Sequence, residues 1–194
     1  QRHMCRRGRL CFVGPDLTEL WYHFSRHFHL GDPDRGEFFI EIDPRTIDTD
    51  KLGLLKGLGV NRLSFGIQDF DEKVQKAINR IQPLAMIEDL VKEARNYQYE
   101  SLNFDLIYGL PHQTVSSVNN TIEKVIDLSP DRISLFNYAH LPQRFKSQGQ
   151  MNEEALPLAG EKLQIMCAAS SRLVEAGYVY VGMDHFAKPS DELS

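Results

Sequence analysis

Short apolar segments alternate with longer amphipathic segments along the chain. The short segments are rich in β-branched and aromatic residues, which is typical of buried strands. They comprise 38–43, 62–68, 102–110, 132–140 and 178–183. The longer segments place apolar residues three and four positions apart, which is the spacing of one helix face. Two such stripes are Ile87, Leu90, Val91, Ala94 and Val118, Ile122, Val125, Ile126. The pattern predicts strands that are separated by helices.

Residues that mark the starts and ends of helices support the same division of the chain into strands and helices. A further stripe precedes the first predicted strand and begins after Pro15, which a first helical turn tolerates. Its members are Leu17, Leu20, Trp21, Phe24 and Phe28. Gly59 and Gly177 stand where helices commonly end in a left-handed residue, and Pro130 follows a helix expected to end near Leu128. Strands and helices that alternate with short connections predict βαβ units and a parallel sheet, either doubly wound or part of a (β/α) barrel.

Composition narrows the class of protein. The 194 residues are 42% hydrophobic and 25% charged, with a net charge of −5, which is typical of a folded globular domain. No long basic stripe is present, so a nucleic-acid partner is not expected. No apolar run approaches the roughly 18 residues that span a bilayer, so a membrane partner is not expected either. Cys5, Cys11 and Cys167 are an odd, scattered set, which argues against a disulfide framework and favours the cytoplasm.

Polar residues lie at the carboxyl ends of the predicted strands, where parallel α/β folds bind their ligands. They are Glu41, Asp43, Gln68, Asp69, Asp105, Asn137, Tyr138 and His140. A carboxylate inside a buried strand needs a partner or a ligand, because burying it unpaired costs free energy. Glu41, Gln68 and Asp105 therefore predict a ring of hydrogen-bonding groups on three successive strands, suited to a ligand with hydroxyls and an ammonium group.

Several of these polar residues have simpler structural explanations. Asp69 precedes Asp71, and we expect it to cap the following helix. Asp43 precedes a proline, so a turn role is expected. His140 by itself is more typical of a hydrogen-bonded structural histidine than of a ligand. Arg80 is consistent with a surface charge at a helix end.

Common catalytic motifs are absent from the sequence. It has no Gly-x-Ser-x-Gly, no phosphate-binding loop with Lys and Ser or Thr, and no His-Glu-x-x-His zinc motif. The residues alone therefore predict an α/β domain that binds a polar small molecule at its strand ends.

Five longer strings carry a family resemblance. They are FFIEIDPRTID, GVNRLSFGIQDFDEKVQKAINRIQ, NFDLIYGLPHQT, PDRISLFNYAHLP and GYVYVGMDHFAKPSDEL. In this order, from about Asp16 onward, they resemble the oxygen-independent coproporphyrinogen III oxidases (coproporphyrinogen dehydrogenases) of the radical SAM superfamily. FNYAHLP and GMDHFAKPSDEL distinguish these enzymes from a sister branch of heme-trafficking proteins.

The resemblance implies an α/β fold that is a partial (β/α) radical SAM barrel, of which this chain supplies roughly the last four of six parallel strands. It implies oxidative decarboxylation of coproporphyrinogen III to protoporphyrinogen IX in anaerobic heme biosynthesis. In this chemistry a reduced 4Fe-4S cluster cleaves S-adenosylmethionine, and the resulting radical takes a hydrogen from a propionate. The implied partners are coproporphyrinogen III and an external electron donor, and members of the family are usually monomeric.

The resemblance also assigns cofactor-binding residues. Glu41 of FIEIDPR would contact the S-adenosylmethionine at the cluster. Gln68, Arg80, Asp105 and Ala139 would contact a second S-adenosylmethionine. No catalytic residue is assigned.

The sequence departs from the family pattern at its start and its end. Members carry Cys-x-x-x-Cys-x-x-Cys for the cluster, whereas Cys5 and Cys11 have five residues between them. We therefore expect no metal ligands in this chain and an internal fragment that is not catalytically competent by itself. Its expected parts are a non-matching segment, 1–14, and an incomplete radical SAM barrel domain, 15–194. We expect the fragment to self-associate, because its first strand lacks a partner.

An alternative function stays open at this point. A heme-binding or heme-delivery protein of the sister branch would use histidine ligands, for which His140 and His185 are available.

Overall fold

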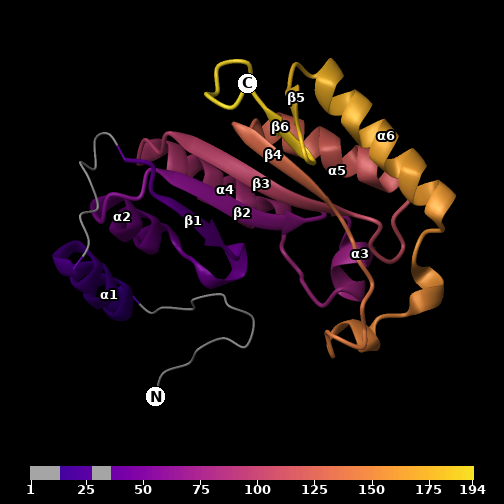
Figure 1. The fold of residues 1–194 in the computed structure, drawn as a ribbon, viewed down its shortest axis with the longest axis horizontal. Helices are drawn as coiled ribbons and strands as arrows, with labels where there is room; N and C mark the ends of the chain where they lie inside the picture. The colour runs from indigo at the N-terminus through magenta and orange to yellow at the C-terminus, as the bar shows by residue number, and fades with distance from the viewer. Residues whose placement is uncertain (1–13, 28–35) are drawn as a thin grey trace.

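The fold is one mixed sheet flanked by helices (Figure 1), in a computed structural model that describes residues 14–27 and 36–194. In spatial order the strands are β1 (Phe39–Ile42), β2 (Arg62–Gln68), β3 (Ser101–Tyr108), β4 (Arg132–Asn137), β6 (His185–Ala187) and β5 (Val179–Gly182). The α-helices are α1 (Gly14–His27), α2 (Thr49–Gly57), α3 (Glu72–Ala77), α4 (Leu84–Asn96), α5 (Val115–Leu128) and α6 (Ala159–Glu175). Short 3₁₀ helices are η1 (Pro44–Thr46), η2 (Gln148–Gln150) and η3 (Glu153–Ala155).

The predicted helix boundaries are confirmed by the backbone. Gly59 and Gly177 have φ values of 93° and 94° just beyond α2 and α6, a conformation that glycine adopts without steric cost. Helix α5 begins with a capping box in which Thr114 and Ser117 exchange hydrogen bonds, and it ends at left-handed Ser129, before Pro130. These local signals mark helix ends of α2, α5 and α6.

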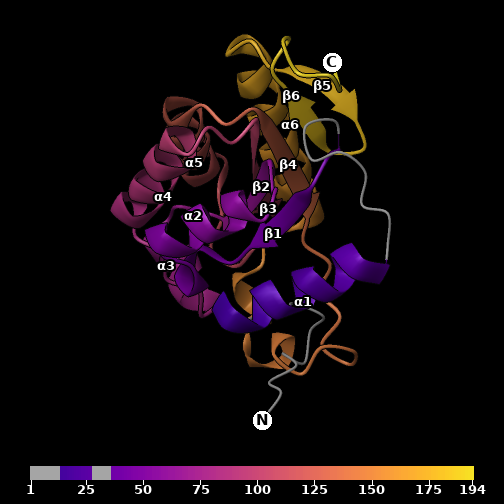
Figure 2. The same ribbon diagram turned by 90° about the vertical axis from the view of Figure 1, so that its left-hand side faces the viewer.

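Strands β1 to β4 run parallel and pair in sequence order. Figure 2 shows α2, α3, α4 and α5 on one side of these four strands, which is the arrangement of a barrel segment and not of a doubly wound sheet. The expectation of four parallel barrel strands is therefore confirmed. The sheet is not closed among the described residues, and its two edges are β1 and β5. Self-association through β1 stays a prediction.

Side chains of β2 show how the two faces of the sheet differ. Leu63, Phe65 and Ile67 are fully buried in the core against the helices, and Phe65 packs edge-on to Phe104 of β3 at 6.3 Å between ring centroids. Ser64 and Gly66 alternate with them and belong to the opposite face, because successive strand residues point to opposite sides. We call this opposite side the open face.

The last predicted strand, 178–183, was expected to continue the parallel sheet, and this expectation is wrong. β5 forms a hairpin with β6, which pairs antiparallel with both β5 and β4. The turn residues Met183 and Asp184 have φ values of 48° and 66°, and positive values at both positions are typical of a type I′ hairpin turn. Asn-Gly and Asp-Gly are the usual sequence signals for such turns. This turn has Met-Asp instead, so the sequence pattern did not predict the hairpin.

A cluster of ion pairs holds the end of the described chain against the sheet. Arg132 of β4 donates to both carboxylate oxygens of Asp191 at 3.0 Å, and Glu192 bridges Arg132 and Arg62 of β2. Glu37 also pairs with Arg62, at 2.6 Å. The Asp191 side chain is 6% exposed, whereas the Glu192 side chain is 61% exposed. Asp191 is therefore the member of this cluster whose charge matters most for stability.

We expect the Asp191 ion pair to stabilise the fold at neutral pH and to be lost in acid. Burial raises the pKa of Asp191, but the hydrogen bond and charge of Arg132 outweigh burial and leave the pKa below its ordinary value. A depressed pKa adds stability above the unfolded-state pKa of about 3.9, and this contribution disappears as the pH falls through the folded-state pKa. Asp191→Asn should lower the free energy of unfolding by about 1–2 kcal/mol at pH 7.

Urea unfolding at pH 7 and at pH 3 measures this effect, with Glu192→Gln as the exposed control. The difference between Asp191→Asn and the unsubstituted protein should shrink in acid. An equal difference at both pH values would contradict the assignment.

Candidate active site

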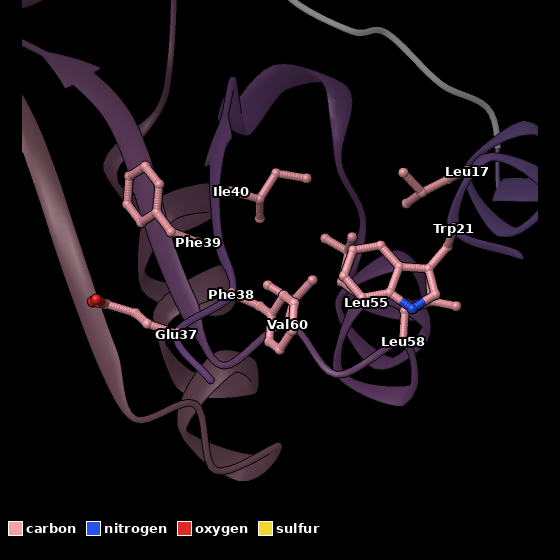
Figure 3. A pocket seen from close by; sticks show the side chains of 9 residues that line it. All are labelled: Leu17, Trp21, Glu37, Phe38, Phe39, Ile40, Leu55, Leu58 and Val60. Carbon is pink, nitrogen blue, oxygen red and sulfur yellow. The ribbon is translucent and has the colours of Figure 1, made fainter. Parts of the chain in front are cut away.

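Two of the cavities beside the sheet differ in the chemistry of the described residues that line them. The first, of about 250 Å³, lies between α1 and the β1 edge and is lined almost entirely by apolar side chains (Figure 3). Trp21 packs edge-on to Phe38 there at 5.5 Å, and Glu37 lies at the margin. The second, of about 320 Å³, lies on the open face and includes Glu41, Asn103, Asp105 and Ser134. Only the second cavity has the converging polar groups that orient a ligand.

Strand register brings the polar residues of the open face together. Glu41 of β1 is paired with Ser64 of β2, which is paired with Asn103 of β3. Asp105, two residues further along β3, is paired with Ser134 of β4. Two members of the predicted ring, Glu41 and Asp105, therefore line one cavity, whereas the third, Gln68 at the end of β2, does not line it.

Glu41 and Gln68 present polar ends that no other described residue engages. Neither side chain makes a hydrogen bond or an ion pair within residues 14–27 and 36–194, and Glu41 is exposed. Gln68 ends β2 with a φ of 70°, which turns the chain at the carboxyl end of the strand. Both side chains are thus available to a ligand.

Gly66 creates the space in which two of the predicted residues meet. A Cβ atom at Gly66 would lie 2.9 Å from Arg80 Nη2 and 2.9 Å from Gln68 Nε2, closer than real Cβ contacts. The ends of Arg80 and Gln68 therefore lie together beside Gly66, which is paired in register with Asp105. Gly66 was not predicted as a site residue, although in RLSFGIQ it shares one strand face with Ser64 and Gln68, two positions away on either side.

Arg80 is 8% exposed, so its interpretation as a surface charge is wrong. Its Nη2 donates to Gly66 O at 2.8 Å and its Nη1 to Asp43 Oδ2 at 3.0 Å. Asp43 also accepts from the Arg45 backbone and side chain at the start of η1, which confirms the expected turn role. Burial raises the pKa of Asp43, but the Arg45 hydrogen bond and the charge of Arg80 lower it below its ordinary value. Arg80 therefore ties the ends of β1 and β2 together as a cation.

Asp69 is not the helix cap that the sequence predicted. The cap of α3 is Asp71, which accepts from the backbone of Lys73 and Val74. Asp69 is fully buried and accepts from Thr121 Oγ1 at 2.6 Å, from Gln113 Nε2 at 2.5 Å and from the Asp71 backbone. Burial raises the pKa of Asp69 despite these donors. Its role is to join β2 to α5 and to the loop before α5.

Ala139 and His140 lie in the loop after β4, whereas His185 is the first residue of β6. His140 has both ring nitrogens engaged, Nδ1 with Tyr138 Oη and Nε2 with Glu153 Oε1, each at 3.0 Å. This favours the structural interpretation of His140 over the ligand interpretation. His185 Nδ1 lies 2.6 Å from Met183 O. Ala139 is exposed in the loop after β4, its carbonyl accepts from Gln148, and it does not line the open-face cavity.

Two carboxylates of the open face, Glu41 and Asp105, have no ion pair with any described residue. Carboxylates of this kind can accept hydrogen bonds from ammonium or hydroxyl groups of a ligand. Cluster thiolates are not found in the part of the chain that the structure describes, where Cys167 on α6 is the single cysteine. No group of three or more metal-binding side chains occurs in that part either. Cys5 and Cys11 lie outside the described residues.

Among the described residues, no helix combines the length and the apolar composition that a membrane span needs.

Comparisons with known proteins agree with this geometry. An oxygen-independent coproporphyrinogen III oxidase from Pseudomonas aeruginosa is 50% identical over 188 residues, which are 96% of this chain and 41% of that protein. The enzyme of the same name from Synechocystis sp. is 50% identical over 161 residues, covering 83% of this chain and 34% of that protein. The chain therefore spans well under half the length of these curated relatives.

A solved structure gives the same result at the level of the fold. Coproporphyrinogen III oxidase (HemN) from Escherichia coli, described as a radical SAM enzyme, matches with a TM-score of 0.90 and 42% identity. The match covers 93% of this chain and 41% of that chain. The sequence model of the radical SAM superfamily matches residues 8–125. Since that match covers more than half of the chain, and the parallel sheet and its polar open face agree with it, the protein belongs to the radical SAM superfamily.

Proposed function

We propose that the open face of this protein binds S-adenosylmethionine, as part of an oxygen-independent coproporphyrinogen III oxidase. The observation that carries the proposal is the convergence of Gln68 and Arg80 beside Gly66, next to Asp105 in the strand register. The relatives named above support the choice of reaction. In that reaction, two propionate side chains of coproporphyrinogen III become the vinyl groups of protoporphyrinogen IX.

Each proposed site residue has a role that follows from its chemistry. Glu41, whose carboxylate no described residue engages, accepts hydrogen bonds from the ammonium group of one S-adenosylmethionine. Gln68 and Asp105 offer an amide and a carboxylate to a second S-adenosylmethionine. The guanidinium of Arg80 is the positively charged group beside them. Ala139, which lies in the loop after β4 and does not line the open-face cavity, belongs to this second site through the family resemblance alone.

Bound S-adenosylmethionine would supply the carbon radical that this oxidation of the propionate requires. The described residues do not supply cluster ligands, so we assign the cleavage step to none of them. Their work is to bind and orient the cofactor, which lowers the entropic cost of the reaction. The coproporphyrinogen substrate and the external electron donor belong to this proposal as properties of the whole enzyme.

Gly66→Ala tests the site directly. The added methyl group must displace Gln68 or Arg80, and since Arg80 is held by Asp43 and by Gly66 O, the Gln68 amide is the group expected to move. We expect S-adenosylmethionine binding, measured by isothermal titration calorimetry, to weaken at least about tenfold, which is the effect of losing one good hydrogen bond to a charged ligand.

The matched control is Gly57→Ala, because a Cβ at Gly57 on α2 meets nothing within 4 Å. This variant should bind S-adenosylmethionine as the unsubstituted chain does. Binding that is absent from the unsubstituted chain, or unchanged in Gly66→Ala, would argue against the proposal.

A further inference from the structure

The hydrogen bonds around Asp105 form a closed triangle. Ser64 Oγ donates to Asp105 Oδ2 at 2.8 Å, and Asn103 Nδ2 donates to Asp105 Oδ1 at 2.8 Å. Asn103 Nδ2 also donates to Ser64 Oγ at 2.7 Å. Both hydrogens of the Asn103 amide and the hydroxyl hydrogen of Ser64 are therefore used within the triangle.

A fourth residue fixes the orientation of the amide. Ser134 of β4 donates to Asn103 Oδ1 at 3.3 Å, so the amide oxygen must point toward β4 and the amide nitrogen toward Asp105. Ser64, Asn103 and Ser134 are 1%, 8% and 3% exposed. Since these residues lie on three adjacent strands, the rigid sheet fixes their positions, as a precise binding site requires.

The charge of Asp105 makes these donors important. No cation among the described residues pairs with Asp105. The arginines of the same cavity, Arg62 and Arg132, are paired with Glu37, Asp191 and Glu192. A carboxylate at a half-buried position without an ion pair is stabilised by hydrogen bonds to its charged form.

The triangle leaves part of the carboxylate for a ligand. An ionised carboxylate offers about four lone-pair positions, and Ser64 and Asn103 occupy one on each oxygen. The others remain for hydroxyl or ammonium donors of a molecule in the cavity. Glu41 and Gln68, in contrast, have no such support among the described residues, so Asp105 is the polar group of the site whose orientation is set before binding.

We infer that Ser64 and Asn103 are positioning residues that hold the Asp105 carboxylate in the orientation in which it binds the donor groups of S-adenosylmethionine. This inference rests on the proposed function, because it concerns the same site. Neither residue has to touch the ligand for this role.

Binding of S-adenosylmethionine to the full chain, measured by equilibrium dialysis, tests the inference. Ser64→Ala and Asn103→Ala should each weaken binding about tenfold, since each removes one donor to a charged group. Ser64→Cys keeps the shape of the side chain but replaces a strong donor with a larger, weakly donating thiol, so it should also weaken binding. The control is Ser170→Ala, a half-buried serine of α6 that lies outside the open-face cavity, and its affinity should stay unchanged.

A double-mutant cycle separates positioning from general structural damage. In an Asp105→Ala background, adding Ser64→Ala should change the dissociation constant less than about twofold, because a residue that acts through Asp105 has nothing left to position. Full additivity, or normal affinity in Ser64→Ala and Asn103→Ala, would overturn the inference and leave the proposed function intact. Absence of binding by the unsubstituted chain would overturn both.

Discussion

Asp69→Ala is expected to lower the free energy of unfolding by about 3 kcal/mol, because it leaves several buried donors without an acceptor. The hydroxyl of Thr121, the amide of Gln113 and the backbone N–H of Asp71 all donate to this one carboxylate. Chemical denaturation followed by circular dichroism measures the change.

Asp69→Asn is the sharper variant of the same experiment. In this variant an amide nitrogen, which is a donor, replaces one of the two carboxylate oxygens. It must face either the Gln113 amide or the Thr121 hydroxyl together with the Asp71 backbone N–H. In both orientations a donor faces another donor. Gln113 cannot simply reverse its amide, since its oxygen accepts from Leu110 N at 2.8 Å and its nitrogen also donates to Ile107 O at 2.8 Å. We therefore expect Asp69→Asn to be destabilised by about 2 kcal/mol as well.

Asp71→Asn provides the control for both Asp69 variants. Asp71 is the cap of α3, and asparagine caps a helix about as well as aspartate does. Its stability should stay within about 0.5 kcal/mol of the unsubstituted protein. Asp69 variants as stable as this control would show that the buried hydrogen bonds are not needed.

Arg80→Leu is expected to reduce both stability and S-adenosylmethionine binding. Removing one partner of a buried ion pair generally lowers the free energy of unfolding by about 3–5 kcal/mol. Because Arg45 still pairs with Asp43 in this variant, we expect a smaller decrease of about 2 kcal/mol. Binding should weaken at least about tenfold, because the Arg80 guanidinium beside Gly66 is lost. Urea unfolding and titration calorimetry measure the two effects.

Arg45→Leu is the matched control, because Arg45 pairs with the same carboxylate from a position at which its side chain is 38% exposed. A solvent-exposed ion pair contributes about 0–1 kcal/mol. We therefore expect a small loss of stability and unchanged binding. Equal effects of the two arginine variants would contradict the distinction between them.

The sequence predicted the helices and the four parallel strands well because their signals are local. The apolar stripe that contains Ile87 and Leu90, the glycine after α2 and the capping of α5 each depend on residues within a few positions of one another. The β5–β6 hairpin was missed for the opposite reason. Its turn uses two non-glycine residues with positive φ, and it is supported by pairing with the distant β4.

The candidate site was predictable only in part. Glu41, Gln68 and Asp105 drew attention because a polar residue in an apolar strand is visible in the sequence, and the register places Glu41 and Asp105 in one cavity. The predictions for Arg80 as a surface charge and for Asp69 as a helix cap were wrong, because both rested on neighbouring residues in the sequence. Their partners, Gly66 for Arg80 and Thr121 for Asp69, are 14 and 52 residues away.

The sequence by itself determined where the chain forms strands and helices and which family it resembles, because periodicity, capping residues and motifs act over short separations. The tertiary structure alone decided which polar groups meet. Ser64, Asn103 and Ser134 come together around Asp105 only because strands β2, β3 and β4 pair in one particular register. A hydrogen bond forms only when donor and acceptor lie about 3 Å apart, and residues distant in sequence reach that separation only through the packing of the whole sheet.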